Sequence, residues 1–213
     1  LEIPLRERNE LLTAAGFAAM FPERSLNDEA LQAARQTIEV ILQGHEPNPA
    51  LAVDRHWNLL TANRAVSVIL QGVNPTLLQP PINVLRLGVH PEGLAPNILN
   101  FSEWRAHLLE RLRRQIEITA DPRLLTLEVE LKSYPAPRTS ERLKPVDASH
   151  IAIPLRMRVQ EAELSFISTI TIFGNPVDIT LAELAIESFF PADPATAQWL
   201  RQVMPRESPA TAI

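Results

Sequence analysis

The sequence of 213 residues contains no cysteine, which excludes disulfide bonds, thiolate metal ligands and a cysteine nucleophile, and which fits a cytoplasmic protein. It also lacks an apolar run near the ~18 residues that a membrane-spanning helix needs, and no signal-peptide pattern opens it. Glycine is scarce, with 6 residues against 19 prolines, so we expect short elements separated by stiff loops. The formal net charge of -5 argues against nucleic-acid binding by this chain alone.

The motifs of the common catalytic and metal-binding sites are missing as well. The sequence has no serine nucleophile elbow, no glycine-rich phosphate loop and no plausible catalytic triad. Its 5 histidines show no paired spacing on one helix face that would hold a metal ion. We therefore predict that the chain is not an enzyme, that it carries no metal or other cofactor, and that its function is binding.

Hydrophobic periodicity predicts helices through the first two thirds of the chain and mostly strands after them. A period near 3.6 residues marks the helices, and strict alternation marks the strands. The predicted helices cover residues 1–15, 25–44, 63–70, 80–89, 102–118, 121–132 and 192–201, with Asn63, Ser102 and Asp121 at the start of three of them. The predicted strands cover residues 51–53, 59–62, 151–159, 164–172 and 178–190.

Two strands, several helices and then three strands predict an α+β fold. We expect one five-stranded antiparallel sheet with helices on one face, which is the arrangement of a PAS domain, plus further N-terminal helices. In the last strand, Leu184 and Ile186 should face the core, and Glu183 and Glu187 should face away. The expected organisation is a helical linker or dimerisation segment at 1–44, a PAS-like ligand-binding domain at 45–204 and a tail at 205–213.

Two arginines fall in the middle of apolar helical faces. Arg105 shares a stripe with Phe101 and Leu108, and Arg86 lies between Ile82 and Val89. A guanidinium keeps its charge in a protein, so burying one without an anion costs several kcal/mol. Something negative should therefore lie between these helices, either a carboxylate of the protein or a ligand.

Four segments of the chain resemble the MmyB-like transcription regulators of actinobacteria and relatives. The resemblance extends from Pro4 to about Asp193 and is weakest in the connector at 135–148. The segments are PLRERNELLTAAGFAAMFPERSL, PALAVDRHWNLLTANRA, INVLRLGVHPEGLAPNILNFSEWRAHLLERLRRQ and PVDITLAELAIESFFPAD.

This resemblance implies a helix-turn-helix domain followed by a PAS-like domain that accepts a fatty-acid-like molecule, with links to antibiotic metabolism. The DNA-binding helices are not in the sequence, and residues 1–15 look like the segment that joins them to the sensor. We therefore expect the effector-sensing part of a regulator, a homodimer that reaches DNA only through the missing domain.

A fatty acid needs a long apolar slot and one cationic end. Arg86 and Arg105 are the predicted carboxylate clamp, because arginine can hold both oxygens at once. Asn83 and His90 flank Arg86 and could add donors, although capping or loop roles suit both better. The expected apolar wall is Leu85, Ile98, Phe101, Trp104, Leu108 and Leu109 from the helices, and Phe166, Ile170, Leu184 and Ile186 from the sheet.

Two alternatives stay open at this point. Arg86 and Arg105 could instead pair with Asp54 or another carboxylate of the protein and so fix the fold. The whole domain could also be a structural dimerisation module with a filled core and no ligand.

Overall fold

A computed structural model describes residues 3–137 and 153–204 of the chain. Its centre is one antiparallel sheet of five strands in the order β2-β1-β5-β4-β3, so the last strand in sequence lies in the middle. The strands are β1 (Ala50–Val53), β2 (Leu59–Ala62), β3 (Leu155–Val159), β4 (Ala162–Ile172) and β5 (Ala185–Pro191). The predicted α+β fold with a five-stranded antiparallel sheet is confirmed.

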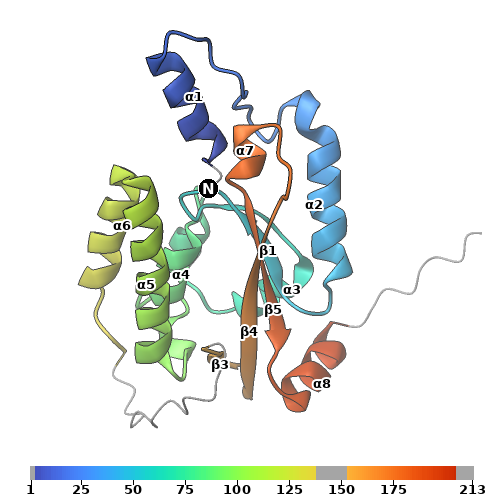
Figure 1. The fold of residues 1–213 in the computed structure, drawn as a ribbon. Coiled ribbons are helices and arrows are strands. Elements are labelled where there is room, and N and C mark those ends of the chain that lie inside the picture. The colour runs from blue at the N-terminus through green and yellow to red at the C-terminus, as the bar shows by residue number, and fades with distance from the viewer. Residues whose placement is uncertain (1–2, 138–152, 205–213) are drawn as a thin grey trace, which may run out of the picture.

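Helices surround this sheet on both sides (Figure 1). The α-helices are α1 (Leu5–Ala14), α2 (Gln32–Gly44), α3 (Arg64–Ile69), α4 (Val84–Val89), α5 (Phe101–Thr119), α6 (Pro122–Ser133), α7 (Ile179–Ala182) and α8 (Pro194–Val203). Short 3-10 turns lie at Glu29–Leu31, Pro75–Leu78 and Ala95–Asn97. None of the helices in the part of the chain described is long and apolar enough to cross a membrane.

The main hydrophobic core lies on the face of the sheet covered by α3, α4, α5 and α6. It joins Leu51 and Val53 of β1 with Phe166 of β4 and with the buried stripe of α5. A second, smaller core lies on the opposite face, where Ile38 and Leu42 of α2 pack against alternate residues of β1 and β5. Residues of one strand therefore reach two different cores, as strand alternation requires.

The longest helix, α5, ends and gives way to α6 through a sharp backbone turn. Ala120 has a left-handed conformation with φ 50°, and Asp121 then accepts a hydrogen bond from the backbone N–H of Arg123 as the N-cap of α6. Pro122 occupies the first turn, as predicted. At the other end, α5 begins at Phe101, so Ser102 is not its N-cap.

Asn63 plays a different part from the one predicted. It precedes α3, but its side chain makes no capping hydrogen bond. Its Oδ1 instead accepts from the backbone N–H of Ala50, and its Nδ2 donates to the carbonyl oxygens of Leu42 and Asn48. One buried amide thus joins the end of α2 to β1 and to the loop between them.

Candidate functional site

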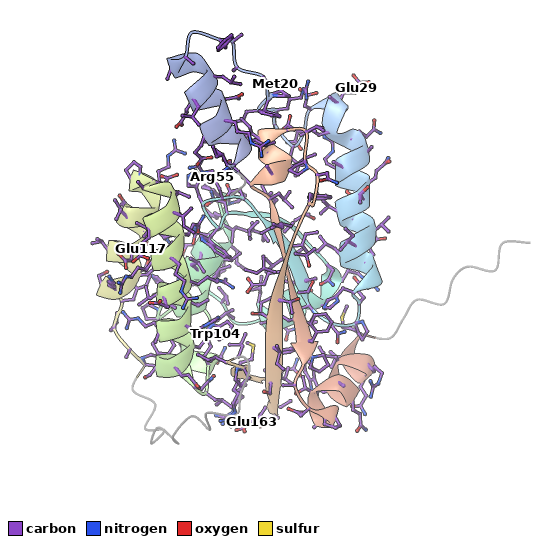
Figure 2. The ribbon with its side chains drawn as sticks, in the orientation of Figure 1. Met20, Glu29, Arg55, Trp104, Glu117 and Glu163 are labelled. Atoms are coloured by element: carbon purple, nitrogen blue, oxygen red, sulfur yellow. The ribbon has the colours of Figure 1, made fainter. Side chains whose placement is uncertain are left out.

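An apolar pocket lies between the sheet and helices α3, α4 and α5. Its volume is about 90 Å³, below the roughly 300–1,000 Å³ of typical small-molecule sites. Figure 2 shows Trp104 in the layer of side chains between α5 and the sheet. The lining residues include Leu51, Leu59, Val66, Ile69, Leu85, Gly88, Leu94, Ile98, Trp104, Leu108, Arg111, Met157, Glu187 and Phe189.

The helical part of the predicted apolar wall coincides partly with this pocket. Leu85, Ile98, Trp104 and Leu108 all line it. Phe101 is buried in the surrounding core and Leu109 packs against that core, but neither lines the pocket. The sequence therefore located the correct face of α5, because Trp104 and Leu108 are one helical turn apart.

None of the four sheet residues predicted for the apolar wall lines the pocket. Leu184 and Ile186 face α2 in the smaller core, on the other side of the sheet from the pocket. Ile170 is 43% exposed, and Phe166 is buried in the main core without lining the pocket. The physical reason lies in α2, whose apolar stripe offers Ile186 a second buried layer and so reverses the expected orientation of β5.

Arg86 does not reach the pocket, because a carboxylate of the protein holds it elsewhere. Its Nε and Nη2 donate to the two oxygens of Glu130 on α6, at 2.5 Å and 2.8 Å. The Tyr134 hydroxyl donates to the same carboxylate. The hydrogen bonds from Arg86 hold the pKa of Glu130 below its ordinary value. The alternative of an internal salt bridge is therefore what the structure contains for Arg86.

Arg105 also turns away from the pocket. Its Nη2 donates to the backbone carbonyls of Leu131 and Lys132, at 3.0 Å and 2.9 Å, in the last turn of α6. These carbonyls have no partner within the helix and carry its partial negative charge. Arg105 thus ties α5 to the C-terminal end of α6, and its anion is a helix terminus.

Asn83 and His90 have local roles. The Oδ1 of Asn83 accepts from the backbone N–H of Arg86 as the N-cap of α4, and its Nδ2 donates to the carbonyl of His56. The Nδ1 of His90 accepts from the backbone N–H of Glu92, and its ring contacts Tyr134 edge-on. Neither residue lines the pocket, so the capping and loop roles are the ones observed.

We expect the Arg105→Ala variant to bind a carboxylate amphiphile within about twofold of the wild type. Its free energy of unfolding should fall by about 1–2 kcal/mol, because two hydrogen bonds to the end of α6 are lost. Isothermal titration with dodecanoate and urea unfolding measure the two quantities. A large loss of dodecanoate binding would reinstate the clamp predicted from the sequence.

The charged residues that do line the pocket are Arg111 and Glu187. The Nη1 of Arg111 donates to Oε1 of Glu187 at 3.0 Å, and the guanidinium lies over the Trp57 ring, with its carbon 4.3 Å from the ring centroid. Glu187 is only 4% exposed. The Nε and Nη2 of Arg111 are buried and have no hydrogen-bond partner among the residues described.

The signal that could have found Arg111 is present in the sequence. Arg111 comes three residues after Leu108 and seven after Trp104, so it lies on the side of α5 that faces the pocket, whereas Arg105 lies on the side of Phe101 and Leu112. Glu187 was expected to face away from the core, so the sequence did not indicate that it is the partner of Arg111. The half-buried ring of His107 packs near Trp104, and burial, together with the charge of Arg111, lowers the pKa of its imidazole.

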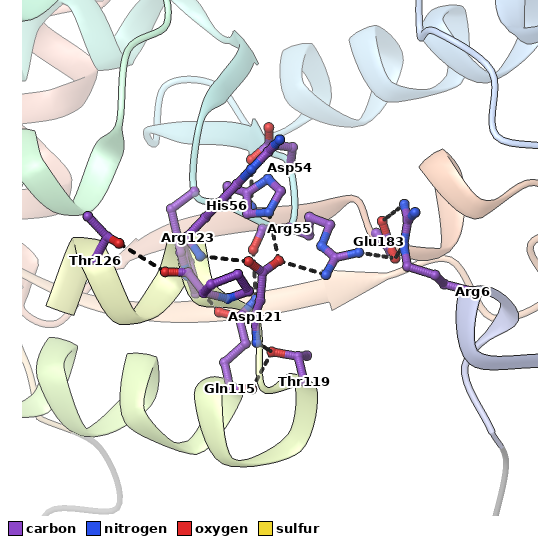
Figure 3. A network of polar contacts seen from close by, with 12 residues as sticks. Arg6, Asp54, Arg55, His56, Gln115, Thr119, Asp121, Arg123, Thr126 and Glu183 are labelled. Atoms are coloured by element: carbon purple, nitrogen blue, oxygen red, sulfur yellow. Dashed lines mark hydrogen bonds and ion pairs between the residues drawn. The ribbon is translucent and has the colours of Figure 1, made fainter. Parts of the chain in front are cut away.

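A network of polar side chains extends from this pocket to α1 (Figure 3). The Oε1 of Gln115 accepts from the Trp57 indole, and its Nε2 donates to the carbonyl of Arg55, both at 2.7 Å. The Arg55 guanidinium donates to Asp121 at 2.7 Å and to Glu183 at 3.1 Å. Arg6 of α1 holds both oxygens of Glu183, at 2.7 Å and 2.9 Å.

The carboxylate of Asp121 has a pKa well below the ordinary value for aspartate. Burial raises its pKa, but the backbone N–H of Arg123, the His56 ring and the Arg55 charge outweigh burial and lower the pKa to about 2. Ionised Asp121 therefore contributes stability that is complete above the ordinary aspartate pKa of 3.8 and is lost as the pH falls through about 2.

We expect the Asp121→Asn variant to lose part of the acid sensitivity of folding. Wild-type stability should fall between about pH 4 and pH 2, and the variant should show a shallower fall, because asparagine takes up no proton in this range. Urea unfolding at a series of pH values measures both slopes. Identical slopes would show that Asp121 is not responsible.

Among the residues described, no group of three or more histidine, cysteine, aspartate or glutamate side chains could hold a metal ion. The two charged residues that line the pocket form one ion pair within a mainly apolar lining. This arrangement is suited to binding an amphiphile.

Comparison with protein families gives a match over most of the chain. The family model described as the MmyB-like transcription regulator ligand binding domain matches residues 34–203. This range includes most of α2, the sheet, the pocket and α8. A search of curated proteins finds no match.

Proposed function

Because the chain belongs to the family of MmyB-like transcription regulator ligand binding domains, we propose that its pocket binds a fatty-acid-like carboxylate. The observation that carries this proposal is the partly buried Arg111, whose Nε and Nη2 are buried and lack a hydrogen-bond partner among the residues described, in a pocket where Glu187 is the other charged residue. The family membership supplies the regulatory role, and Arg111 supplies the chemistry of the head group.

The head group would be held by one edge of the Arg111 guanidinium. Glu187 takes Nη1, which leaves Nε and Nη2 side by side on the opposite edge. Two parallel N–H donors on one edge match the two oxygens of a carboxylate. Because stacking on the Trp57 ring fixes the guanidinium plane, this edge is oriented before a ligand arrives.

The tail of the ligand would lie against the apolar wall of the pocket. Leu85, Trp104 and Leu108 face this space, with Met157 from the sheet. A volume of about 90 Å³ is too small for a long alkyl chain, so binding requires the helices to move away from the sheet. In this proposal, the expected homodimer and its DNA-binding part respond to that movement.

The experiment that tests the proposal compares two amphiphiles of equal chain length. We expect dodecanoate to bind much more tightly than dodecanol, because only the carboxylate can take both N–H groups of Arg111. Native mass spectrometry detects uptake, and isothermal titration gives the affinities.

A pocket-filling variant provides the matched control. The Cβ of a substituted Gly88 would lie 3.5 Å from Leu108 Cδ1, so the side chain in Gly88→Met enters the pocket and should abolish binding of both amphiphiles. The same change at Gly44, where a Cβ meets nothing within 4 Å, should leave binding unchanged. If neither amphiphile binds the wild type, the proposal fails and the dimerisation module with a filled core becomes the better interpretation.

A further inference from the structure

Apolar burial contributes little to holding the N-terminal helix α1 on the rest of the molecule. Leu5 is its one buried side chain, whereas Leu11 is 56% exposed. Next to Leu5, Arg6 donates two hydrogen bonds to Glu183 and also forms an ion pair with Glu23. A helix of 10 residues is marginal in water by itself, so its attachment depends strongly on this pairing.

Glu183 is shared between two arginines. Its Oε1 accepts from Arg6 Nε at 2.7 Å and from Arg55 Nη1 at 3.1 Å. The two cations therefore compete for one oxygen atom, and they repel each other across it. The strength with which α1 is held thus depends on the position of Arg55.

Arg55 is tied to α5 from two directions. Its backbone carbonyl accepts from Gln115 on α5, and its guanidinium donates to Asp121, which follows α5 directly. The orientation of the Gln115 amide is fixed chemically, because the Trp57 indole can only donate and the Arg55 carbonyl can only accept. Arg55 therefore follows α5 when α5 moves.

The turn that carries Arg55 is also strained. Trp57 has φ 67°, a left-handed conformation that a bulky side chain rarely adopts and that costs about 1–3 kcal/mol. Its indole bond to Gln115 and its stacking under Arg111 hold it there. A change at Arg111 or in α5 therefore alters a contact that holds this turn in its strained conformation.

We propose that Gln115 couples occupancy of the pocket to the attachment of α1. This coupling rests on the proposed function, because the ligand is what displaces α5. The sheet is held by backbone hydrogen bonds, whereas α5 is held by side chains, so α5 yields when the small cavity fills. Gln115 and Asp121 then draw Arg55 away from Glu183, and Glu183 Oε1 is left to Arg6 alone. Ligand binding thereby holds α1 more tightly.

Hydrogen exchange measured on the full 213-residue chain tests this coupling. With saturating dodecanoate, amide exchange across residues 5–14 should slow by about fivefold, a typical size for coupling between two sites. The Gln115→Met variant keeps the size of the side chain but none of its hydrogen bonds. At saturating dodecanoate it should show no slowing in α1.

The matched control is Glu117→Gln, an exposed change on the same helix that should keep the full response. Dodecanoate binding without slower exchange in α1, or an unchanged response in Gln115→Met, would overturn this inference and leave the proposed function standing. Absence of dodecanoate binding to the wild type would overturn both.

Discussion

Replacing Arg111 with methionine should abolish detectable dodecanoate binding and lower the free energy of unfolding by about 3–5 kcal/mol. The reason for the second effect is Glu187, which is 4% exposed and would keep its place in the pocket without its cation. Titration with dodecanoate and urea unfolding near neutral pH give the two values.

The double variant Arg111→Met/Glu187→Met separates these two effects. With both charges removed, two apolar side chains of similar volume fill the space, and stability should return to about that of the wild type or exceed it. Carboxylate binding should stay lost. An exposed change on the same helix, Arg113→Met, should alter neither quantity. Tight dodecanoate binding by either Arg111 variant would contradict the assignment of the head-group site.

The second large effect is expected at Asn63. Replacement by leucine would leave the backbone N–H of Ala50 and the carbonyls of Leu42 and Asn48 without this partner. Because the lost hydrogen bonds are buried or half-buried, the free energy of unfolding should fall by about 3 kcal/mol or more. Thermal and urea unfolding measure this loss.

A serine variant distinguishes the two roles considered for Asn63. Serine caps helices about as well as asparagine, so Asn63→Ser would preserve stability if the residue acted as an N-cap. A serine hydroxyl is too short and has too few donors to replace the three observed bonds, and we expect it to be nearly as damaging as leucine. The half-buried Asn74, which forms an Asx turn with Thr76, provides a comparison: Asn74→Ala should cost less than about 1 kcal/mol.

The sequence was sufficient to predict the sheet and most of the helices, because each has a clear period. The alternation in 155–159 and the apolar stripe of α5 both indicate which residues are buried. What periodicity cannot supply is which face of a strand meets which layer. Both faces of β5 are covered, so the rule of apolar inside and polar outside has no single answer there.

Helical spacing identified the face of α5 that lines the pocket, but not which arginine lies there. The arginine of α5 expected at the pocket was Arg105, and the one that lines it is Arg111. Helical spacing could have indicated Arg111, but the partners of the two arginines, Glu187 and the end of α6, come together only through tertiary packing. Pocket residues on α4 and α5 were accessible to prediction because helical spacing is local, whereas pairings between distant segments were not.

The two-sided pairing of β5 also bears on how the chain reaches its native topology. In β5, Ile186 faces α2 and its neighbour Glu187 faces Arg111. A slip of one residue during sheet assembly would exchange the two side chains. It would place a carboxylate among aliphatic side chains and leave the Arg111 guanidinium without an anion. Misaligned intermediates are thus penalised on both faces at once. We expect the ion pair to contribute little net stability and to favour one alignment of the central strand, which is a form of folding fidelity.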